Sequence, residues 1–204
     1  MSRYTGPRLR VMRALGVELP GLSRKSTERR PYPPGEHGGR RRRPDSVFGT
    51  QLKEKQKLKM NYGVTESQMR RLVKQARKSK IAAGVRVLEL LESRMDNAVF
   101  RAGFASSIPA ARQLVNHGHF MLNGRKTDVP SAQVKAGDSI QVRQRSFNLA
   151  VLTESLAQPS LYLPDWITLD MEKKQATVTS APTAESVPFL IDVQQVIEYY
   201  NTRI

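Results

Sequence analysis

Residues 90–142 read LLESRMDNAVFRAGFASSIPAARQLVNHGHFMLNGRKTDVPSAQVKAGDSIQV, and this stretch decides the fold of the chain. Apolar residues recur at helical spacing from Val87 to Val99. Gly103 follows, at the position where a left-handed residue commonly ends a helix. We therefore predict a first amphipathic helix that ends just before Gly103.

A second helix is predicted between Ser107 and Gly118. Ser107 is a good N-cap residue, and Pro109 is tolerated in the first turn because its missing N–H has no intrahelical partner to lose. Three polar side chains lie outside the apolar face of this helix and are available to a ligand: Arg112, Gln113 and Asn116.

Short strands are predicted after the second helix. Residues 119–122 form the first strand, and the Asn123-Gly124 pair is a strong signal for a hairpin turn. After another turn at 136–138, apolar and polar residues alternate over 139–143, which is the period of a strand. The predicted layout is therefore helix, helix, turn and strands.

Cationic and amide side chains gather around the second helix and the hairpin turn. The candidate binding residues of this region are Arg112, Gln113, Asn116, His117, Asn123 and Arg125. Such a compact surface suits the phosphates and 2′-hydroxyls of RNA, and it needs no catalytic base or nucleophile. His117 and His119 have no third ligand near them in sequence, so we predict no metal there. Helix-end packing and RNA contact both remain open for this pair.

The charge of the chain favours the same class of partner. The chain has 34 Lys and Arg against 18 Asp and Glu, a net charge of +16, and a pI near 10.6, which is typical of nucleic-acid-binding domains. Residues 1–150 hold 31 basic and 11 acidic residues, whereas residues 151–204 hold 3 and 7. A polyanion is the predicted partner, and the C-terminal quarter is not its main surface.

Two basic helices precede the quoted stretch. One is predicted to begin at Thr50 as its N-cap, and the other opens with capping-box spacing over 65–68. Their outward cations are predicted phosphate contacts: Lys53, Lys57, Arg70, Arg71 and Lys74. An ordinary solvated face is the alternative for any one of them. However, Glu66 is the only acidic residue between positions 60 and 81, which favours an external anion.

The first 45 residues are rich in Pro, Gly and Arg. The prolines prevent a long helix, and the run Arg40–Arg43 repels itself unless phosphates neutralise it. We expect this segment to order on RNA, and a floppy tail without a specific partner is the alternative. Its predicted phosphate contacts are Arg3, Arg8, Arg10, Arg40, Arg41, Arg42 and Arg43.

The motifs of this chain resemble those of a known family. Residues 111–119 (ARQLVNHGH), Asn123-Gly124-Arg125 and Gly137-Asp138 resemble the RNA-binding module shared by small-subunit ribosomal protein four, some pseudouridine synthases and bacterial tyrosyl-tRNA synthetases. The motifs at 3–10, 34–38, 54–58 and 62–64 resemble the ribosomal protein itself, in its bacterial or plastid type. The resemblance covers nearly the whole chain and is weakest between about 145 and 185.

The resemblance implies a structural constituent of the small ribosomal subunit. Such a protein would bind the small-subunit ribosomal RNA directly, organise an RNA junction, nucleate assembly of the subunit body and contribute to translational accuracy. Its other implied partners are small-subunit ribosomal proteins five and twelve and, at the entry side, messenger RNA. Its implied location is the ribosome of the cytoplasm, with the plastid stroma as the alternative.

The chain contains no cysteine, which excludes disulfides, thiol catalysis and thiolate zinc sites. Some members of the resembling family carry a cysteine zinc cluster in the N-terminal segment, so this chain departs from them. We therefore expect no metal and no cofactor. No apolar run approaches the roughly eighteen residues of a membrane span, and we expect an intracellular protein without membrane contact.

The predicted fold class is α+β. The expected parts are a basic extended segment over 1–45, a helical body formed by 46–92 with 150–204, and an inserted helix-helix-strand RNA-binding module over 93–149. The C-terminal part should contain two short strands, with Trp166 in the core, and a helix from about Asp192. Its packing against the first part, and the insertion of the module, are implied by the resemblance alone.

Two other function classes fit the sequence less well. An RNA-modifying enzyme could use the same module as a guide, but the residues after the module are too few and too acidic to form a catalytic domain. A general polyanion or membrane-surface binder would need a basic amphipathic helix with a bulky apolar face, which the sequence lacks. We therefore predict that the protein is not an enzyme.

Overall fold

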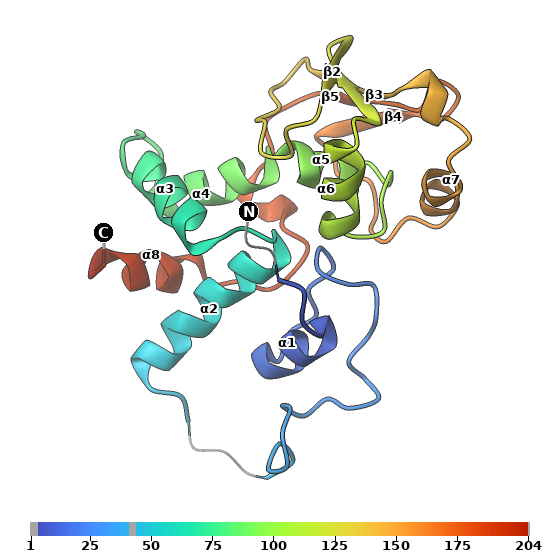
Figure 1. Cartoon of the computed structure of the whole chain (residues 1–204). Coiled ribbons are helices and arrows are strands. Elements are labelled where there is room, and N and C mark those ends of the chain that lie inside the picture. The colour runs from blue at the N-terminus through green and yellow to red at the C-terminus, as the bar shows by residue number, and fades with distance from the viewer. Residues whose placement is uncertain (1–3, 41–43, 204) are drawn as a thin grey trace. The chain divides into compact units, whose positions relative to one another are not determined.

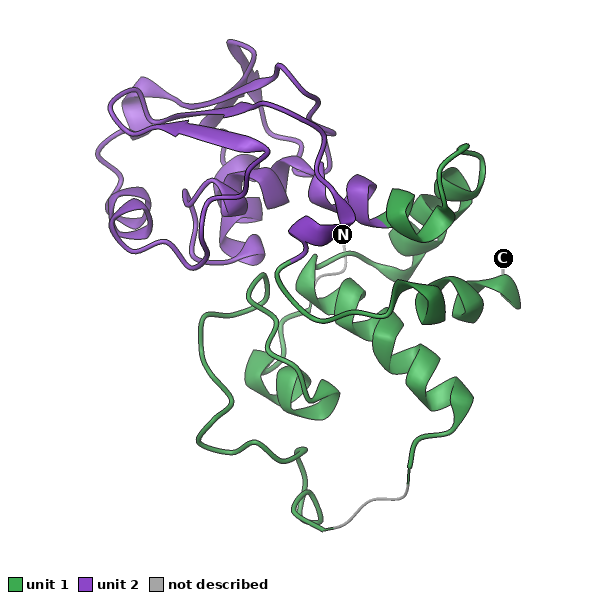
Figure 2. Ribbon diagram, turned by 180° about the vertical axis from the view of Figure 1, so that it is seen from behind, with its two compact units in different colours: residues 1–87, 188–204 green, residues 88–187 purple. Residues whose placement is uncertain are grey.

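The computed structural model describes residues 4–40 and 44–203. The chain divides into two compact units, shown in separate colours in Figure 2. Unit 1 comprises residues 1–87 and 188–204, and unit 2 comprises residues 88–187. Among the described residues, all the strands belong to one sheet in unit 2, while helices occur in both units (Figure 1). The α+β class predicted from the sequence is confirmed.

Unit 1 is helical in its described part. Its helices are α1 (Arg8–Leu15), α2 (Val47–Asn61), α3 (Glu66–Arg77), the first half of α4 (Ala83–Glu92) and α8 (Val193–Asn201). The C-terminal helix α8 packs on α2, where the rings of Phe48 and Tyr199 stack 6.1 Å apart. The buried Tyr200 of α8 donates a hydrogen bond to Glu66 of α3, over 2.8 Å. The last helix of the chain thereby joins α2 to α3.

The start of α3 agrees with the sequence, and the start of α2 does not. Thr65 and Gln68 form the predicted capping box. Helix α2, however, is capped by Ser46, whose Oγ accepts a hydrogen bond from the backbone of Gly49 over 3.1 Å. The prediction of Thr50 as the cap was therefore wrong. Ser46 has the same capping chemistry one turn earlier, and Thr50 instead donates its hydroxyl to the Ser46 carbonyl.

The N-terminal segment, expected to be extended, contains a short helix. Helix α1 ends at Gly16, whose N–H donates to the carbonyl of Met12 over 2.8 Å. The side chains of Met12, Leu19 and Leu22 form a buried cluster that also contacts Phe189. These apolar residues give the segment a small core, which the prolines alone did not reveal.

The first helix predicted for the quoted stretch is divided in two. Helix α4 ends at Glu92 and α5 begins at Met95, because the backbone between them pairs with residues 130–134 instead of continuing the helix. The N–H groups of Met95 and Asp96 donate to the carbonyls of Ala132 and Pro130, over 2.8 and 3.1 Å. Gly103 has the predicted left-handed conformation after α5.

Unit 2 combines small helices with a five-stranded antiparallel sheet in the order β2-β1-β3-β5-β4. Its remaining helices are α5 (Met95–Arg101), α6 (Ile108–Asn116), α7 (Ala150–Ala157) and the short 3₁₀ turns η1 (Gln144–Ser146) and η2 (Ala184–Ser186). Its strands are β1 (Phe120–Leu122), β2 (Arg125–Thr127), β3 (Ser139–Val142), β4 (Ile167–Asp170) and β5 (Gln175–Val178). Asn123 and Gly124 both have positive φ, 51° and 75°, as the predicted hairpin turn requires.

The C-terminal strands join the sheet of unit 2. Strand β5 pairs with β3, with Ile140 opposite Ala176, and β4 pairs with β5. Residues 150–187 therefore lie with unit 2, whereas the sequence placed them with the helical body. Of the residues after 150, only 188–204 belong to unit 1. The pairing of β3 with β5 is the physical reason, because it continues the sheet across the expected boundary. Trp166, at the edge of β4, is buried as predicted.

Candidate nucleic-acid interface

Helix α3 presents a cationic face in unit 1. The buried side of the helix is formed by Met69, Val73 and Ala76, as the apolar spacing predicts. The opposite side carries three exposed cations, which we call the α3 cationic face: Arg70, Arg71 and Lys74. None of the three forms an ion pair with another residue in the described part of the chain. The face can therefore attract an external anion without first losing an internal partner.

Helix α2 carries four lysines that are all paired within unit 1. Lys53 pairs with Asp45, and Lys57 pairs with Glu54 over 2.6 Å. The other two share the carboxylate of one residue of α3, at 3.0 Å from Lys55 and 3.7 Å from Lys59. Lys57 is 8% exposed, so this predicted phosphate contact is both buried and paired.

The shared carboxylate belongs to Glu66 at the start of α3. Burial acts to raise the pKa of Glu66, but hydrogen bonds from Lys55 and Tyr200 and the charges of Lys55 and Lys59 outweigh it, so this pKa lies below its usual value. Conversely, burial raises the pKa of Tyr200, and the Glu66 carboxylate adds to that rise. The carboxylate is thus ionised where α2, α3 and α8 meet.

The N-terminal candidates are partly described. Arg8, Arg10 and Arg40 are exposed, and Arg8 also donates to the carbonyl of Leu22 over 3.3 Å. Four further predicted contacts lie outside the described residues: Arg3, Arg41, Arg42 and Arg43.

In unit 2, Arg112 is held by a buried carboxylate. Asp96, fully buried, accepts hydrogen bonds from Arg112 Nε and Nη2 over 3.0 and 2.6 Å. The same carboxylate accepts a bidentate pair of bonds from the buried Arg94, at 3.0 and 2.8 Å. The sequence placed Arg112 on the outer face of its helix, but its side chain is 24% exposed. Its guanidinium is therefore fixed in place while part of it reaches the surface.

Gln113 and Asn116 are exposed on α6, and His117 is exposed directly after its last residue. Asn116 is three residues and His117 four residues after Gln113, so the three side chains share one side. Arg125 is exposed on the neighbouring hairpin. Asn123 is also exposed, but its amide donates to Asp138 over 2.8 Å and accepts from the backbone of Ser139 over 2.9 Å. Asn123 lies in the predicted hairpin turn, and its side chain also ties that turn to Asp138 and Ser139, which the sequence did not predict.

Sequence reasoning missed a group of cations at the end of α6: Lys126, Arg143 and Arg145. The Lys126 side chain crosses the helix end so closely that a Cβ at Gly118 would lie 2.6 Å from its Cε. Arg143 donates to the Gly118 carbonyl over 3.2 Å, and Arg145 is exposed. Residue 143 lies opposite residue 119 because β1 pairs with β3, and the sequence of either strand alone does not show this pairing.

The histidine pair lies within this cationic group. The rings of His117 and His119 are 6.0 Å apart, and His119 Nδ1 lies 2.9 Å from the Oγ of Ser146. Burial lowers the pKa of His119 below its usual value, and the charges of His117, Arg145 and Arg143 act in the same direction. Within residues 4–40 and 44–203 no three His, Asp or Glu side chains are grouped so that they could hold a metal ion.

The sequence of this chain is similar to those of known proteins. The family model described as the ribosomal protein S4/S9 N-terminal domain matches residues 3–92, and the model of the S4 domain matches residues 93–140. The small ribosomal subunit protein uS4 of Methylobacillus flagellatus is 56% identical over 205 aligned residues, covering 100% of both chains. The chain belongs to the uS4 family. The uS4B protein of Nitrosomonas europaea is 53% identical with the same coverage. The uS4 protein of a Geobacillus species is 44% identical, over 98% of this chain and 100% of the relative.

Membership of the uS4 family gives the coarse function. The chain is a structural, non-enzymatic protein of the small ribosomal subunit with an RNA-binding S4 domain, so the predicted resemblance is confirmed. The two family models meet after residue 92, five residues beyond the boundary between the units. The described helices include none long and apolar enough to cross a membrane.

Proposed function

We propose that this chain is a primary binding protein for small-subunit ribosomal RNA, which organises an RNA junction and nucleates assembly of the subunit body. The α3 cationic face carries the proposal, because three exposed cations share one side of a helix and pair with no described acid. An unpaired cationic face on a rigid helix is suited to phosphates, whose contacts supply most of the affinity of a protein for RNA.

The second proposed surface is the α6 region of unit 2. Amide and imidazole side chains at Gln113, Asn116 and His117 are suited to 2′-hydroxyls and base edges, while nearby cations are suited to phosphates. The proposed contacts are Arg8, Arg10, Arg40, Arg70, Arg71, Lys74, Gln113, Asn116, His117, Arg125, Lys126, Arg143 and Arg145. Two surfaces on separate units allow one protein to hold two RNA segments.

The predicted RNA contacts that are bonded to other residues of this chain have a smaller role in the proposed function. Lys53, Lys57 and Asn123 would act on RNA indirectly, by fixing the elements that carry the free cations. Arg112 would do both, because Asp96 orients its guanidinium near the surface. Contacts with small-subunit ribosomal proteins five and twelve, contact with messenger RNA at the entry side, and an influence on translational accuracy complete the proposed role, which would be performed in the cytoplasmic ribosome.

Filter binding tests the RNA-binding part of this proposal. The protein should prefer small-subunit ribosomal RNA to random RNA of equal length, since folded junctions present two segments at once. If about ten phosphates are contacted, affinity should fall by roughly three to five orders of magnitude between about 50 and 200 mM salt. Equal affinity for both RNAs, or a shallow salt dependence, would contradict the proposal.

A further inference from the structure

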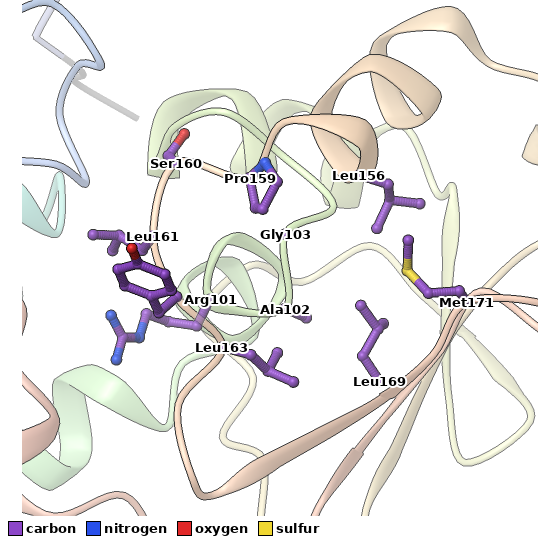
Figure 3. Close-up of a pocket in the computed structure, with 11 residues that line it drawn as sticks. Arg101, Ala102, Gly103, Leu156, Pro159, Ser160, Leu161, Leu163, Leu169 and Met171 are labelled. Atoms are coloured by element: carbon purple, nitrogen blue, oxygen red, sulfur yellow. The ribbon is translucent and has the colours of Figure 1, made fainter.

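An apolar groove of about 540 Å³ lies within unit 2, and none of the residues that line it is among the proposed RNA contacts. It runs between the end of α5, the segment that follows α7, and the end of β4 (Figure 3). The apolar side chains that line it include Leu156, Pro159, Tyr162, Leu163, Leu169 and Met171. Figure 3 shows Leu156, Leu169 and Met171 on one side of the groove and Leu161 on the other.

The groove gathers most of the exposed large apolar side chains of unit 2. Among the described residues of this unit, five such side chains are exposed, and three of them line the groove: Tyr162 at 97%, Met171 at 53% and Leu163 at 45%. Exposed apolar side chains that are grouped around an apolar hollow, unlike ones scattered singly, commonly mark an interaction site. These residues therefore mark a contact surface.

The cation in the groove wall, Arg101, is buried beside an acid of unit 2. It is 6% exposed, and its Nη2 donates to the carbonyl of Ser186 over 2.9 Å. Its Nε lies 3.8 Å from a carboxylate oxygen of Glu92 and makes no hydrogen bond to any described residue. The groove therefore offers no charge that would recruit a phosphate.

The segment that forms most of the groove carries the opposite charge from the rest of the chain. Residues 150–187 contain five acidic residues and two lysines, in a protein of net charge +16. One of the lysines, Lys173, is paired with Asp170 over 3.5 Å, and Glu172 beside it is exposed. This surface repels RNA and attracts a basic polypeptide.

We propose that the groove docks a basic segment of a neighbouring small-subunit protein, anchored by one bulky apolar side chain. The apolar hollow takes the anchor, and carboxylates next to the lining residues in sequence, such as the exposed Glu172 beside Met171, attract the flanking Lys and Arg residues. The proposal rests on the chain acting within the ribosome and adds a protein contact on unit 2, made by residues other than those proposed to bind RNA.

The absence of cysteine from the chain allows a direct test. Tyr162→Cys and, separately, Met171→Cys would each provide the single thiol of the protein, to be coupled to a maleimide-benzophenone photo-cross-linker. The matched control is Val129→Cys, since Val129 is 50% exposed in unit 2 but lies outside the groove. Each labelled protein is assembled into small subunits, irradiated and digested, and the cross-linked peptide or nucleotide is identified by mass spectrometry.

Cross-links from positions 162 and 171 to one basic peptide of another ribosomal protein, absent from the position 129 control, are the expected result. The maleimide reactivity of the unmodified thiol at position 162 should also be lost on assembly. Cross-links to RNA, to a second copy of this chain, or at no more than the control yield would overturn the proposal. A parallel probe at Gln75→Cys, exposed on α3, reports separately on ribosomal RNA and so tests the proposed function independently.

Discussion

Helices α2 and α3 are both basic in sequence, yet their cations have different surroundings in the folded chain. The four lysines of α2 are paired with Asp45, Glu54 and Glu66, whereas Arg70, Arg71 and Lys74 of α3 pair with no described acid. Glu66 belongs to α3, but its carboxylate serves the lysines of α2. The number of charges on a helix therefore does not identify a binding face, because acids on neighbouring elements decide which cations are already paired.

The largest expected difference between the two helices is in RNA affinity. Replacing Arg71 and Lys74 together by Ala should remove two phosphate contacts, which lowers affinity by about two orders of magnitude at about 0.1 M salt and reduces the salt slope by about two. Filter binding to small-subunit ribosomal RNA over a salt series would measure both quantities.

The matched control removes two lysines from α2. Replacing Lys53 and Lys59 by Ala changes the net charge equally, but both are ion-paired within unit 1, so affinity and slope should change little. Equal losses from the two double variants would mean that only total charge matters, and the distinction between the helices would then be lost.

The next largest effect is on the free energy of unfolding. Replacing a cation of α2 should lower it more than replacing a cation of α3. In Lys57→Met the Glu54 carboxylate, whose side chain is 12% exposed, loses its ion-pair partner at 2.6 Å and keeps, among the described residues, only the 3.1 Å hydrogen bond from the backbone of Asp192. Leaving a nearly buried charge unpaired should cost roughly 2–3 kcal/mol of unfolding free energy. Urea denaturation of the free protein would measure this change.

Two further variants test whether the loss of stability comes from the unpaired Glu54 charge. Adding Glu54→Gln to Lys57→Met removes the unpaired charge and should recover part of the loss. Arg71→Met on α3 should stay within about 0.5 kcal/mol of the parent, since an exposed cation without a partner contributes little to the fold. A cost for Arg71→Met as large as that for Lys57→Met would show an interaction of Arg71 that the structure lacks.

Arg112 in unit 2 combines features of both helices: it is bonded to an acid, like the lysines of α2, and it is partly exposed, like the cations of α3. Arg112→Ala removes two hydrogen bonds to Asp96, which keeps Arg94, so the loss of unfolding free energy should be about 1.5 kcal/mol. Arg125→Ala, at an exposed position on the hairpin, should cost less than about 0.5 kcal/mol. Both should weaken RNA binding. Thermal melts followed by circular dichroism would measure the stability of each variant, and binding curves would measure its RNA affinity. Equal stability of the two variants would mean that Arg112 does not stabilise the fold.

Features decided within a few residues were predictable from the sequence. The capping box at Thr65, the turn at Asn123-Gly124 and the start of the last helix at Asp192 all depend on side chains and backbone within about one turn. The pairing of Lys57 with Glu54, three residues earlier, also had a local signal in the i, i+3 spacing of opposite charges.

Features decided between distant segments were not predictable. The break between α4 and α5 requires backbone hydrogen bonds to residues 130–134, and the boundary of unit 2 at residue 187 requires β3 to pair with β5. The position of Arg112 depends on Asp96, sixteen residues earlier. Periodicity describes one element at a time, so it locates a cation on a face without showing which acid another element brings to it.

The smallest effect expected is the pH dependence contributed by Glu66. Because its pKa in the folded chain lies below its usual value of 4.5, the ionised carboxylate stabilises unit 1 above that pH. This contribution is lost as pH falls through the lowered pKa, when protonation weakens the bonds to Lys55 and Tyr200. The gap in unfolding free energy between the parent and Glu66→Gln should therefore narrow on acidification from pH 7 to below about 4.5.

Urea titrations at a series of pH values would follow that gap, with Glu154→Gln, an exposed change on α7 of unit 2, as the control. A gap that stays constant down to acidic pH would mean that Glu66 joins α2, α3 and α8 by shape and neutral hydrogen bonds alone. The lysines of α2 would then be held without the carboxylate charge, and the pairing that distinguishes α2 from α3 would no longer rest on Glu66.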